Sequence, residues 1–311
     1  MIISRKIKIS KEEIDIMYLG EFAEIKQGIA TGENAYYISV LKPANKSYKV
    51  TDPKIILKED ELDKIRNNPD LKKQISNYGI PKKMFQGRTV IPFDKGGTSE
   101  IESGRLSNYF SPTNYFIDWS EESITRMKTF TVQDVKKHLG KTNITNKNKI
   151  EIASRFLNTD YFFTKGITFS FTGIYSPTYR INSNSVFQDA GSGIFTDMFP
   201  PEYLLGILCS KISKYVLKSF VNNSINSSID SIKLIPIPIK NKFQKQIEKL
   251  VQNIINKQKK NPEYNYQTNE QIKIDDFVYR SYGLNKNHID EIENWYDRKF
   301  PKLSIKNTSK L

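Results

Sequence analysis

The sequence has one cysteine and two histidines among its 311 residues. The single thiol, Cys209, excludes an intramolecular disulfide framework and a zinc site made of clustered cysteines, and its apolar surroundings predict a buried, unreactive side chain. His138 and His288 lie far apart in the sequence, and no ligand pattern surrounds either of them. Histidine-based metal centres and catalytic triads therefore lack their residues, and the cysteine usage is typical of a reducing, cytoplasmic compartment.

Long apolar runs are also missing. The longest, residues 203–209, is far shorter than the roughly 20 apolar residues that a membrane-spanning helix requires. The first residues alternate lysine with isoleucine and show neither the apolar core nor the small-residue cleavage site of a secretory signal. We therefore expect no membrane span and no leader peptide.

No phosphate-binding loop of a nucleotide-dependent enzyme is present, because the Walker A and Rossmann fingerprints are both absent. The glycines of residues 189–193 follow a strand-like segment and open no helix, which favours a backbone bend over a cofactor loop. Residues 261–264 are superficially similar to the Asn-Pro-Pro-aromatic tetrad of adenine methyltransferases, but a glutamate replaces the second proline and a turn is predicted. Residues 24–26 have the local Glu-x-Lys form of metal-dependent nucleases, with Asp15 or Asp52 as partner, and a nuclease stays open as an alternative.

Positive charge is the first feature that points to a partner. Lysine and arginine number 48 against 34 aspartates and glutamates, which gives a formal net charge of +14. Such a balance favours a polyanion, most simply nucleic acid. The basic residues are mostly lysine in a chain that is also rich in asparagine and isoleucine, a bias that an AT-rich genome produces on its own.

The apolar pattern predicts an α+β fold, with a β-rich body followed by a helical C-terminal region. Strands are predicted where β-branched and aromatic residues gather: residues 35–40, 89–93 and 114–119, and a meander across 161–197. Helices are predicted where apolar residues recur at three and four: residues 59–78 interrupted at Pro69, 121–139, 201–220 as one helix, 242–259, and 270–297 as a pair broken at Gly283. The prolines of residues 235–239 predict an extended segment, and the glycines of residues 27–34 predict a loop that lets its backbone approach a ligand.

Nine segments, taken in order, resemble a known family: residues 19–34, 91–97, 115–119, 155–158, 165–170, 176–180, 204–211, 235–238 and 274–284. Their order is similar to that in the target-recognition domains of restriction–modification and phage-exclusion adenine-specific DNA methyltransferases, including type IIG-like and TaqI-like C-terminal specificity domains. The resemblance covers roughly residues 18–296. The methyltransferase half that precedes this region in the family is missing, so the resemblance implies a separately encoded methyltransferase subunit, and with it a nuclease subunit in some systems, as partners.

The resemblance implies a DNA sequence-specificity subunit with no catalytic, cofactor-binding or metal-binding residues of its own. Its candidate double-stranded-DNA contacts are Lys26, Gln27, Thr31, Asn34, Lys95, Lys165, Thr168, Ser170 and Arg180. The side chains of Gln27, Asn34 and Arg180 suit bidentate base contacts, whereas lysine and threonine side chains suit the DNA backbone. Gln27, Asn34 and Arg180 each have an ordinary alternative as a polar loop residue or part of a core salt bridge. Trp119 is expected in the core rather than stacked on a base.

Residues 1–240 are thus expected to form the DNA target-recognition domain and residues 241–311 a helical spacer that docks on the methyltransferase. The expected docking stripe is Phe243, Ile247, Leu250, Val251, Ile254 and Ile255. The alternative for this stripe is packing against the chain's own body. Two further functions stay open: a restriction nuclease or degenerate methyltransferase, and a protein-binding anti-restriction module.

Overall fold

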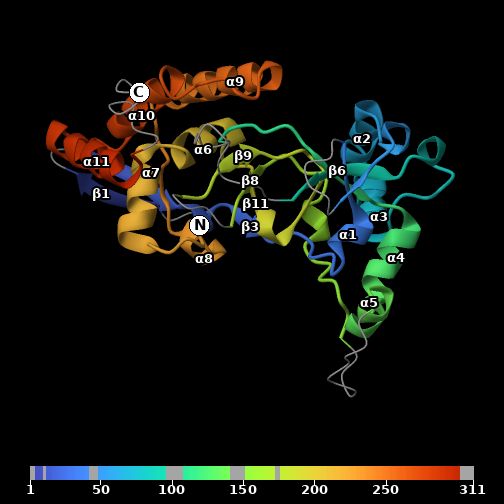
Figure 1. Cartoon of the computed structure of the whole chain (residues 1–311). Coiled ribbons are helices and arrows are strands. Elements are labelled where there is room, and N and C mark those ends of the chain that lie inside the picture. The colour runs from blue at the N-terminus through green and yellow to red at the C-terminus, as the bar shows by residue number, and fades with distance from the viewer. Residues whose placement is uncertain are drawn as a thin grey trace.

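The computed structural model describes residues 4–9, 12–41, 48–95, 108–140, 151–171 and 176–301. It shows the predicted α+β fold, with three small sheets and a helical C-terminal region. The molecule is elongated (Figure 1), with the C-terminal helices at one end, the helices of residues 34–138 at the other, and a four-stranded sheet between them. Gly96 and Gly97 of the segment 91–97, and residues 302–311 of the expected helical spacer, lie outside the described residues.

A hairpin and a proline-rich strand form the first sheet, in the order β1-β2-β12. Its strands are β1 (Arg5–Ile9), β2 (Glu12–Tyr18) and β12 (Pro236–Pro238), all antiparallel. The extended segment predicted from the prolines is confirmed. β12 lies at a sheet edge and pairs on one side only. Proline has no N–H to donate, and at an edge this costs the sheet few backbone hydrogen bonds.

The central sheet has the order β3-β11-β8-β9. Its strands are β3 (Glu24–Lys26), β11 (Gly193–Phe195), β8 (Ile167–Phe169) and β9 (Tyr179–Ile181). Every pairing is antiparallel, and the register aligns Ile25, Ile194, Ile167 and Ile181 across the four strands. Opposed residues of antiparallel strands share a face, so this isoleucine row presents one apolar face to the large core cluster around helix α6 (Pro201–Leu208).

The third sheet has the order β10-β6-β7-β4-β5. Its strands are β10 (Val186–Phe187), β6 (Val90–Asp94), β7 (Tyr115–Asp118), β4 (Ile38–Val40) and β5 (Lys49–Val50). Around them lie α1 (Asn34–Tyr37), α2 (Glu59–Arg66), α3 (Pro69–Tyr78), α4 (Glu121–Thr129) and α5 (Val132–His138). Trp119 is fully buried here and donates its indole N–H to Ile75 O at 2.9 Å, which confirms the core assignment.

Two strand predictions are wrong in part. The segment 161–197 is not one meander, because β10 leaves it to pair in parallel with β6 through Val186 and Phe93. Residues 35–40 are a strand only from Ile38 onward, because one helical turn precedes it. The ion pairs of Glu33 with distant residues, described below, stabilise that turn. The strand propensity of residues 35–40 carries no information about such distant contacts.

The helix predicted over residues 201–220 is also wrong in part, because it breaks after Leu208. Helix α7 (Lys211–Val216) starts anew with Ser210 as its N-cap, and a π-helical turn (Leu217–Val221) follows. Ser210 Oγ accepts from Ser213 N at 3.3 Å, and Asp275 Oδ1 accepts from Lys211 N at 2.9 Å. Both acceptors satisfy N–H groups that a continuous helix would have used internally.

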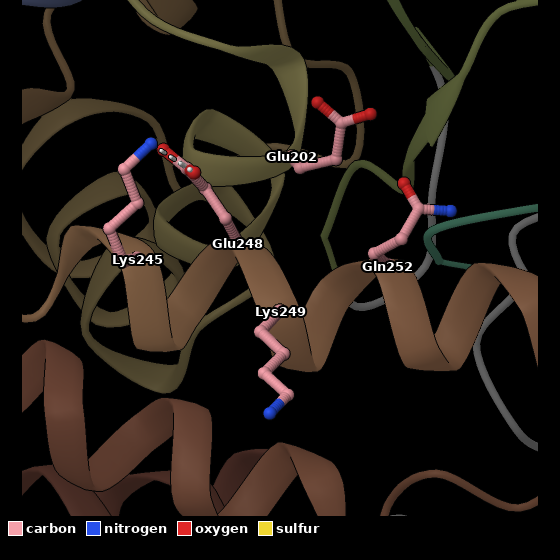
Figure 2. Close-up of a pocket in the computed structure, with 5 residues that line it drawn as sticks. All are labelled: Glu202, Lys245, Glu248, Lys249 and Gln252. Atoms are coloured by element: carbon pink, nitrogen blue, oxygen red, sulfur yellow. Dashed lines mark hydrogen bonds and ion pairs between the residues drawn. The ribbon is translucent and has the colours of Figure 1, made fainter.

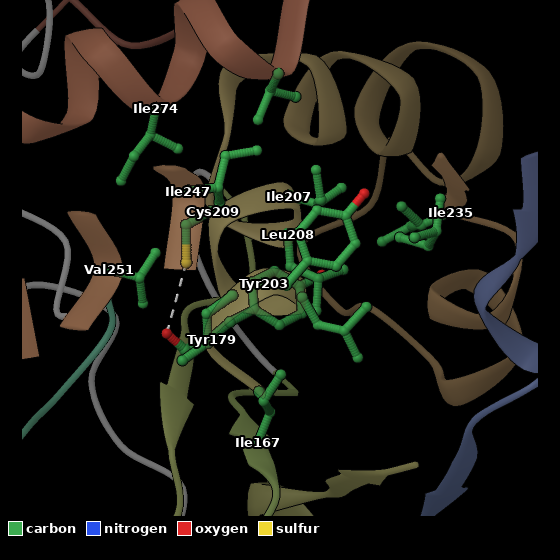
Figure 3. Packing of buried hydrophobic residues seen from close by; sticks show 14 of the residues in the cluster. Ile167, Tyr179, Tyr203, Ile207, Leu208, Cys209, Ile235, Ile247, Val251 and Ile274 are labelled. Atoms are coloured by element: carbon green, nitrogen blue, oxygen red, sulfur yellow. Dashed lines mark hydrogen bonds between the residues drawn. The ribbon is translucent and has the colours of Figure 1, made fainter. Parts of the chain in front are cut away.

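The C-terminal helices are α8 (Ile229–Lys233), α9 (Gln244–Lys260), α10 (Glu270–Ser281) and α11 (Lys286–Lys299). The expected docking stripe of α9 is not free: Ile247, Val251 and Ile254 are fully buried in the same core cluster as α6. A Cβ added at Gly206 of α6 would lie 2.2 Å from Ile247 Cγ2, so the two helices approach very closely (Figure 3). The stripe therefore packs on the chain's own body, and its proposed role as a partner surface was wrong.

The same cluster includes residues on both sides of position 240, so the boundary placed there does not separate two hydrophobic cores. Cys209 is buried within the cluster, and burial raises the pKa of its thiol to about 12. The Cys209 thiol points to Tyr179 O at 3.7 Å (Figure 3). A thiol with so high a pKa carries almost no thiolate at neutral pH, which agrees with the unreactive side chain expected from the sequence.

Candidate nucleic-acid interface

Three of the predicted contact residues lie in one row across the central sheet. The register places Lys26 opposite Gly193, Gly193 opposite Thr168, and Thr168 opposite Arg180. The three side chains therefore share the sheet face opposite to the isoleucine row. The sheet thus brings together residues that are more than 150 positions apart in the sequence.

The hydroxyl residues of this face are buried. Thr168 and Ser170 are each 2% exposed. Ser170 Oγ lies 3.1 Å from Thr178 Oγ1 and accepts from Thr178 N at 3.0 Å. Because they are buried, Thr168 and Ser170 stabilise the sheet. Their hydroxyls are not presented to a backbone phosphate, which corrects the expectation from the sequence.

Arg180 lies within electrostatic range of the buried carboxylate of Asp94. Burial lowers the pKa of the Arg180 guanidinium, and the nearby negative charge of Asp94 opposes that shift. Burial likewise raises the pKa of Asp94, although its Oδ2 accepts from Ser183 N and Ser183 Oγ, each at 2.9 Å. Arg180 thus has a charged neighbour inside the chain, although the two side chains form no direct ion pair among the described contacts, and the residue is half-buried.

The loop 27–34 is held on both sides by backbone hydrogen bonds. Ile29 N donates to Phe187 O at 3.0 Å, and Ala30 and Arg155 exchange two bonds at 3.0 and 2.8 Å. The carbonyl of Gln27 accepts from Asn158 Nδ2 at 2.8 Å. The loop is therefore a strap between two segments far away in the sequence, and its half-buried Gln27 is presented on a fixed backbone.

Glycine is required in this strap for two different reasons. A Cβ at Gly28 would lie 1.8 Å from Phe187 O, which leaves no space for any side chain. Gly32 has φ +75°, and a Cβ there would lie 2.6 Å from Ala153 O. The close approach expected from these glycines occurs, but toward the chain's own backbone.

The far end of the loop is anchored by a buried carboxylate. Glu33 is 5% exposed by its side chain and pairs with Arg126 at 2.9 Å and with His138 at 2.5 Å. Thr31, which is 3% exposed, donates its hydroxyl to Asn34 Oδ1 at 2.7 Å. Thr31 and the side-chain oxygen of Asn34 therefore stabilise the loop from within. No motif or spacing in the sequence predicts that Glu33 and Arg126 anchor this end of the loop.

The three predicted lysines differ in their surroundings. Lys26 pairs with Glu24 at 2.8 Å and lies 5.3 Å from the centre of the Tyr161 ring. Lys95 lies against two tyrosine rings, those of Tyr48 and Tyr115, at 5.4 and 5.0 Å. Lys165 pairs with Glu202 at 3.0 Å and is 53% exposed. Lysine is a residue type suited to phosphate contacts. Of the two ion-paired lysines, Lys165 is the more exposed, at 53% against 29% for Lys26.

Arg155 is a candidate contact that the sequence did not single out. Its backbone holds Ala30, its guanidinium pairs with Asp189 at 2.8 Å, and its side chain is 61% exposed. It is therefore an exposed cation beside the loop 27–34. Only the pairing between residues 30 and 155 reveals this position, because the two segments are unrelated in sequence.

The two carboxylates considered as partners of the nuclease-like triplet both have other partners in the fold. Asp15 pairs with Lys240 at 2.8 Å in another sheet, and Asp52 Oδ1 accepts from Lys54 N at 2.9 Å. Within the described ranges, no three histidine, cysteine, aspartate or glutamate side chains are grouped so that they could hold a metal ion. In the part of the chain that the structure describes, no helix has the length and apolar character to cross a bilayer.

Comparison with known proteins adds no assignment: no protein-family model and no curated protein matches the chain.

Proposed function

We propose that this chain is a non-catalytic DNA sequence-specificity module of an adenine-methyltransferase restriction–modification or phage-defence system, and that it acts with a separately encoded methyltransferase. The observation that supports this most is the placement of Lys26 and Arg180 in one cross-sheet row, with the buried Thr168 between them, beside the braced loop 27–34. The net charge of +14 adds an attraction for a polyanion.

The braced loop suits base reading. A side chain on a fixed backbone loses little further freedom when it binds, so the contact costs less conformational entropy. Gln27 has the amide that pairs with adenine, and Arg180 has the fork that pairs with guanine. Lys26, Lys95, Lys165 and Arg155 supply charge for phosphates, which position the duplex without reading it.

The first test is the salt dependence of duplex binding. The purified chain should bind a labelled duplex at 50 mM salt and lose affinity by roughly 10³ or more at 200 mM if 6–10 phosphates are contacted. Fluorescence anisotropy measures both the affinity and the slope. A polyglutamate competitor at equal charge concentration is the control, and it should displace the duplex poorly. A binding curve indifferent to salt contradicts the proposal.

The second test separates a reader from an anchor, on a cognate site selected from a random duplex library. Gln27→Ala should cost about 1–3 kcal/mol on the cognate site and little on random DNA if its contact is bidentate. Lys165→Gln should weaken both DNAs alike and lower the salt slope by about one, because a phosphate contact carries no sequence information. Equal losses on both DNAs for both variants would show that Gln27 reads no base.

A further inference from the structure

The outer face of α9 carries cations and amides without a carboxylate. Its exposed residues are Lys245, Gln246, Lys249, Asn253, Asn256, Lys257, Lys259 and Lys260. The helix has one acidic residue, Glu248, whose side chain is 17% exposed and pairs with Lys245 at 3.3 Å. The solvent side of the helix is therefore of one sign.

This face is unlike those of the other long helices. Each of the other described helices longer than eight residues exposes at least one carboxylate: Asp70 on α3, Glu121 on α4, Asp276 on α10 and Asp290 on α11. Mixed signs are usual because oppositely charged neighbours stabilise a surface helix. On α9 two lysines have such a partner, Lys245 with Glu248 and Lys257 with Glu270 at 2.8 Å. Among the described residues, Lys249, Lys259 and Lys260 have no carboxylate at ion-pair distance, which points to a negatively charged partner outside the chain.

Part of the face forms a regular stripe of five residues: Gln246, Lys249, Asn253, Asn256 and Lys260. They are three and four positions apart in alternation, so they lie on one side of the helix. At a rise of 1.5 Å per residue the stripe is about 21 Å long. It lies on the side of α9 opposite to the buried Ile247 and Val251.

A hollow between α6 and α9 adjoins this face, and Lys165 pairs with Glu202, one of the residues that line it. Glu202, Lys245, Glu248 and Lys249 line the hollow (Figure 2). Both of its carboxylates are paired, Glu202 with Lys165 and Glu248 with Lys245. Figure 2 shows Lys249 pointing away from both carboxylates, so its charge is directed elsewhere. Lys165, a predicted phosphate contact, thus adjoins the α9 face.

We propose that the outer face of α9, together with Lys242 just before it, binds the phosphate backbone of double-stranded DNA without regard to sequence. The inference rests on the proposed function and extends it to a surface outside the loop 27–34. Lysines and amide N–H groups are common phosphate contacts. DNA offers one charge per roughly 1.7 Å of helix axis, so a stripe of this length meets several phosphates. A protein partner is disfavoured because interface cores need apolar or aromatic side chains, and the exposed residues of α9 include none.

The test compares two triple variants that remove equal charge. One is Lys242→Gln, Lys249→Gln and Lys260→Gln on the α9 face, and the matched control is Lys54→Gln, Lys64→Gln and Lys73→Gln, all exposed positions near and on α2 and α3. The probe is a duplex of mixed sequence, measured by anisotropy from 50 to 200 mM salt. The α9 triple should lose about tenfold or more in affinity at low salt and lower the salt slope by about two to three, while the control loses much less.

Each other outcome overturns the inference in a distinct way. Equal losses in both triples would show that only net charge matters. An α9 triple that binds like the wild type would remove this face as a contact and leave the proposed function intact. A wild type that binds no duplex at low salt would refute both. Binding to phosphatidylserine vesicles that the α9 triple loses, with unchanged DNA binding, would assign the face to a membrane surface. Circular dichroism confirms that both triples are folded.

Discussion

A chain that ends at Ile239 is expected to lose its folded structure. The cut removes α9 and α10, whose Ile247, Val251, Ile254 and Ile274 are fully buried against the body. At about 1.5–3 kcal/mol for each buried aliphatic side chain, the loss is on the order of 10 kcal/mol, comparable to a typical domain's whole stability of about 5–15 kcal/mol. Far-UV circular dichroism and a urea titration of the truncated chain should show no cooperative unfolding.

The matched control supplies the missing part in trans. Residues 240–311, co-expressed as a separate chain, should restore a folded complex. Buried side chains hold the two parts together, so their association does not require the peptide bond between residues 239 and 240. Its polar contacts include Tyr109 Oη to Gln271 Oε1 at 2.8 Å and Gln258 Nε2 to Asn108 O at 3.1 Å. A truncated chain that unfolds cooperatively on its own would instead establish two independent domains with a boundary near residue 240.

Local signals predicted most of the helices. Pro69 ends one helix and opens the next at its first position, with Asn68 Oδ1 accepting from Leu71 N at 3.1 Å. The apolar periodicity of residues 242–259 and the break at Gly283 correspond closely to α9 and to the α10–α11 pair. These features depend on residues within a few positions of one another, so the sequence carries them directly.

Features that depend on distant residues were missed. The break after Leu208 needs Asp275, whose carboxylate accepts from Lys211 N although the two residues are 64 positions apart. The parallel pairing of Val186 with Phe93 is equally nonlocal. Apolar spacing alone indicated a face of α9 that must be covered and could not indicate by which element, which is why both a partner and the chain's own body were considered; the structure shows the chain's own body.

The sequence predicted which residue types the candidate interface contains, and it did not predict which of those side chains are buried. Residue type placed Lys26, Thr168 and Arg180 among the contacts, and strand register then aligned them in one row. Register also decides which polar residues are presented and which are enclosed, so Thr31 proved to be a brace. Arg155 is the opposite case: the sequence did not predict it as a contact, and the fold places its exposed side chain beside the loop.

Gly28→Ala is expected to destabilise the chain and to weaken DNA binding together. The new Cβ would lie 1.8 Å from Phe187 O, and the obstacle is backbone, which a rotamer change cannot move. The strap must shift and weaken the bond from Ile29 N to Phe187 O, at a cost near or above the upper end of the about 1–3 kcal/mol typical of overpacking. Urea unfolding measures the stability, and anisotropy on the selected cognate duplex measures the binding.

The control is Gly140→Asn, a glycine at φ +67° whose added Cβ would have no atom of the described residues within 4 Å. Asparagine tolerates that left-handed conformation better than other side chains do, so stability and binding should change little. If Gly28→Ala unfolds like the wild type, the strap yields easily. A yielding strap does not hold Gln27 in advance of binding, and the entropic argument for base reading at this loop fails. If stability falls while cognate and random duplexes bind as before, the loop is structural and the readers lie elsewhere in the molecule.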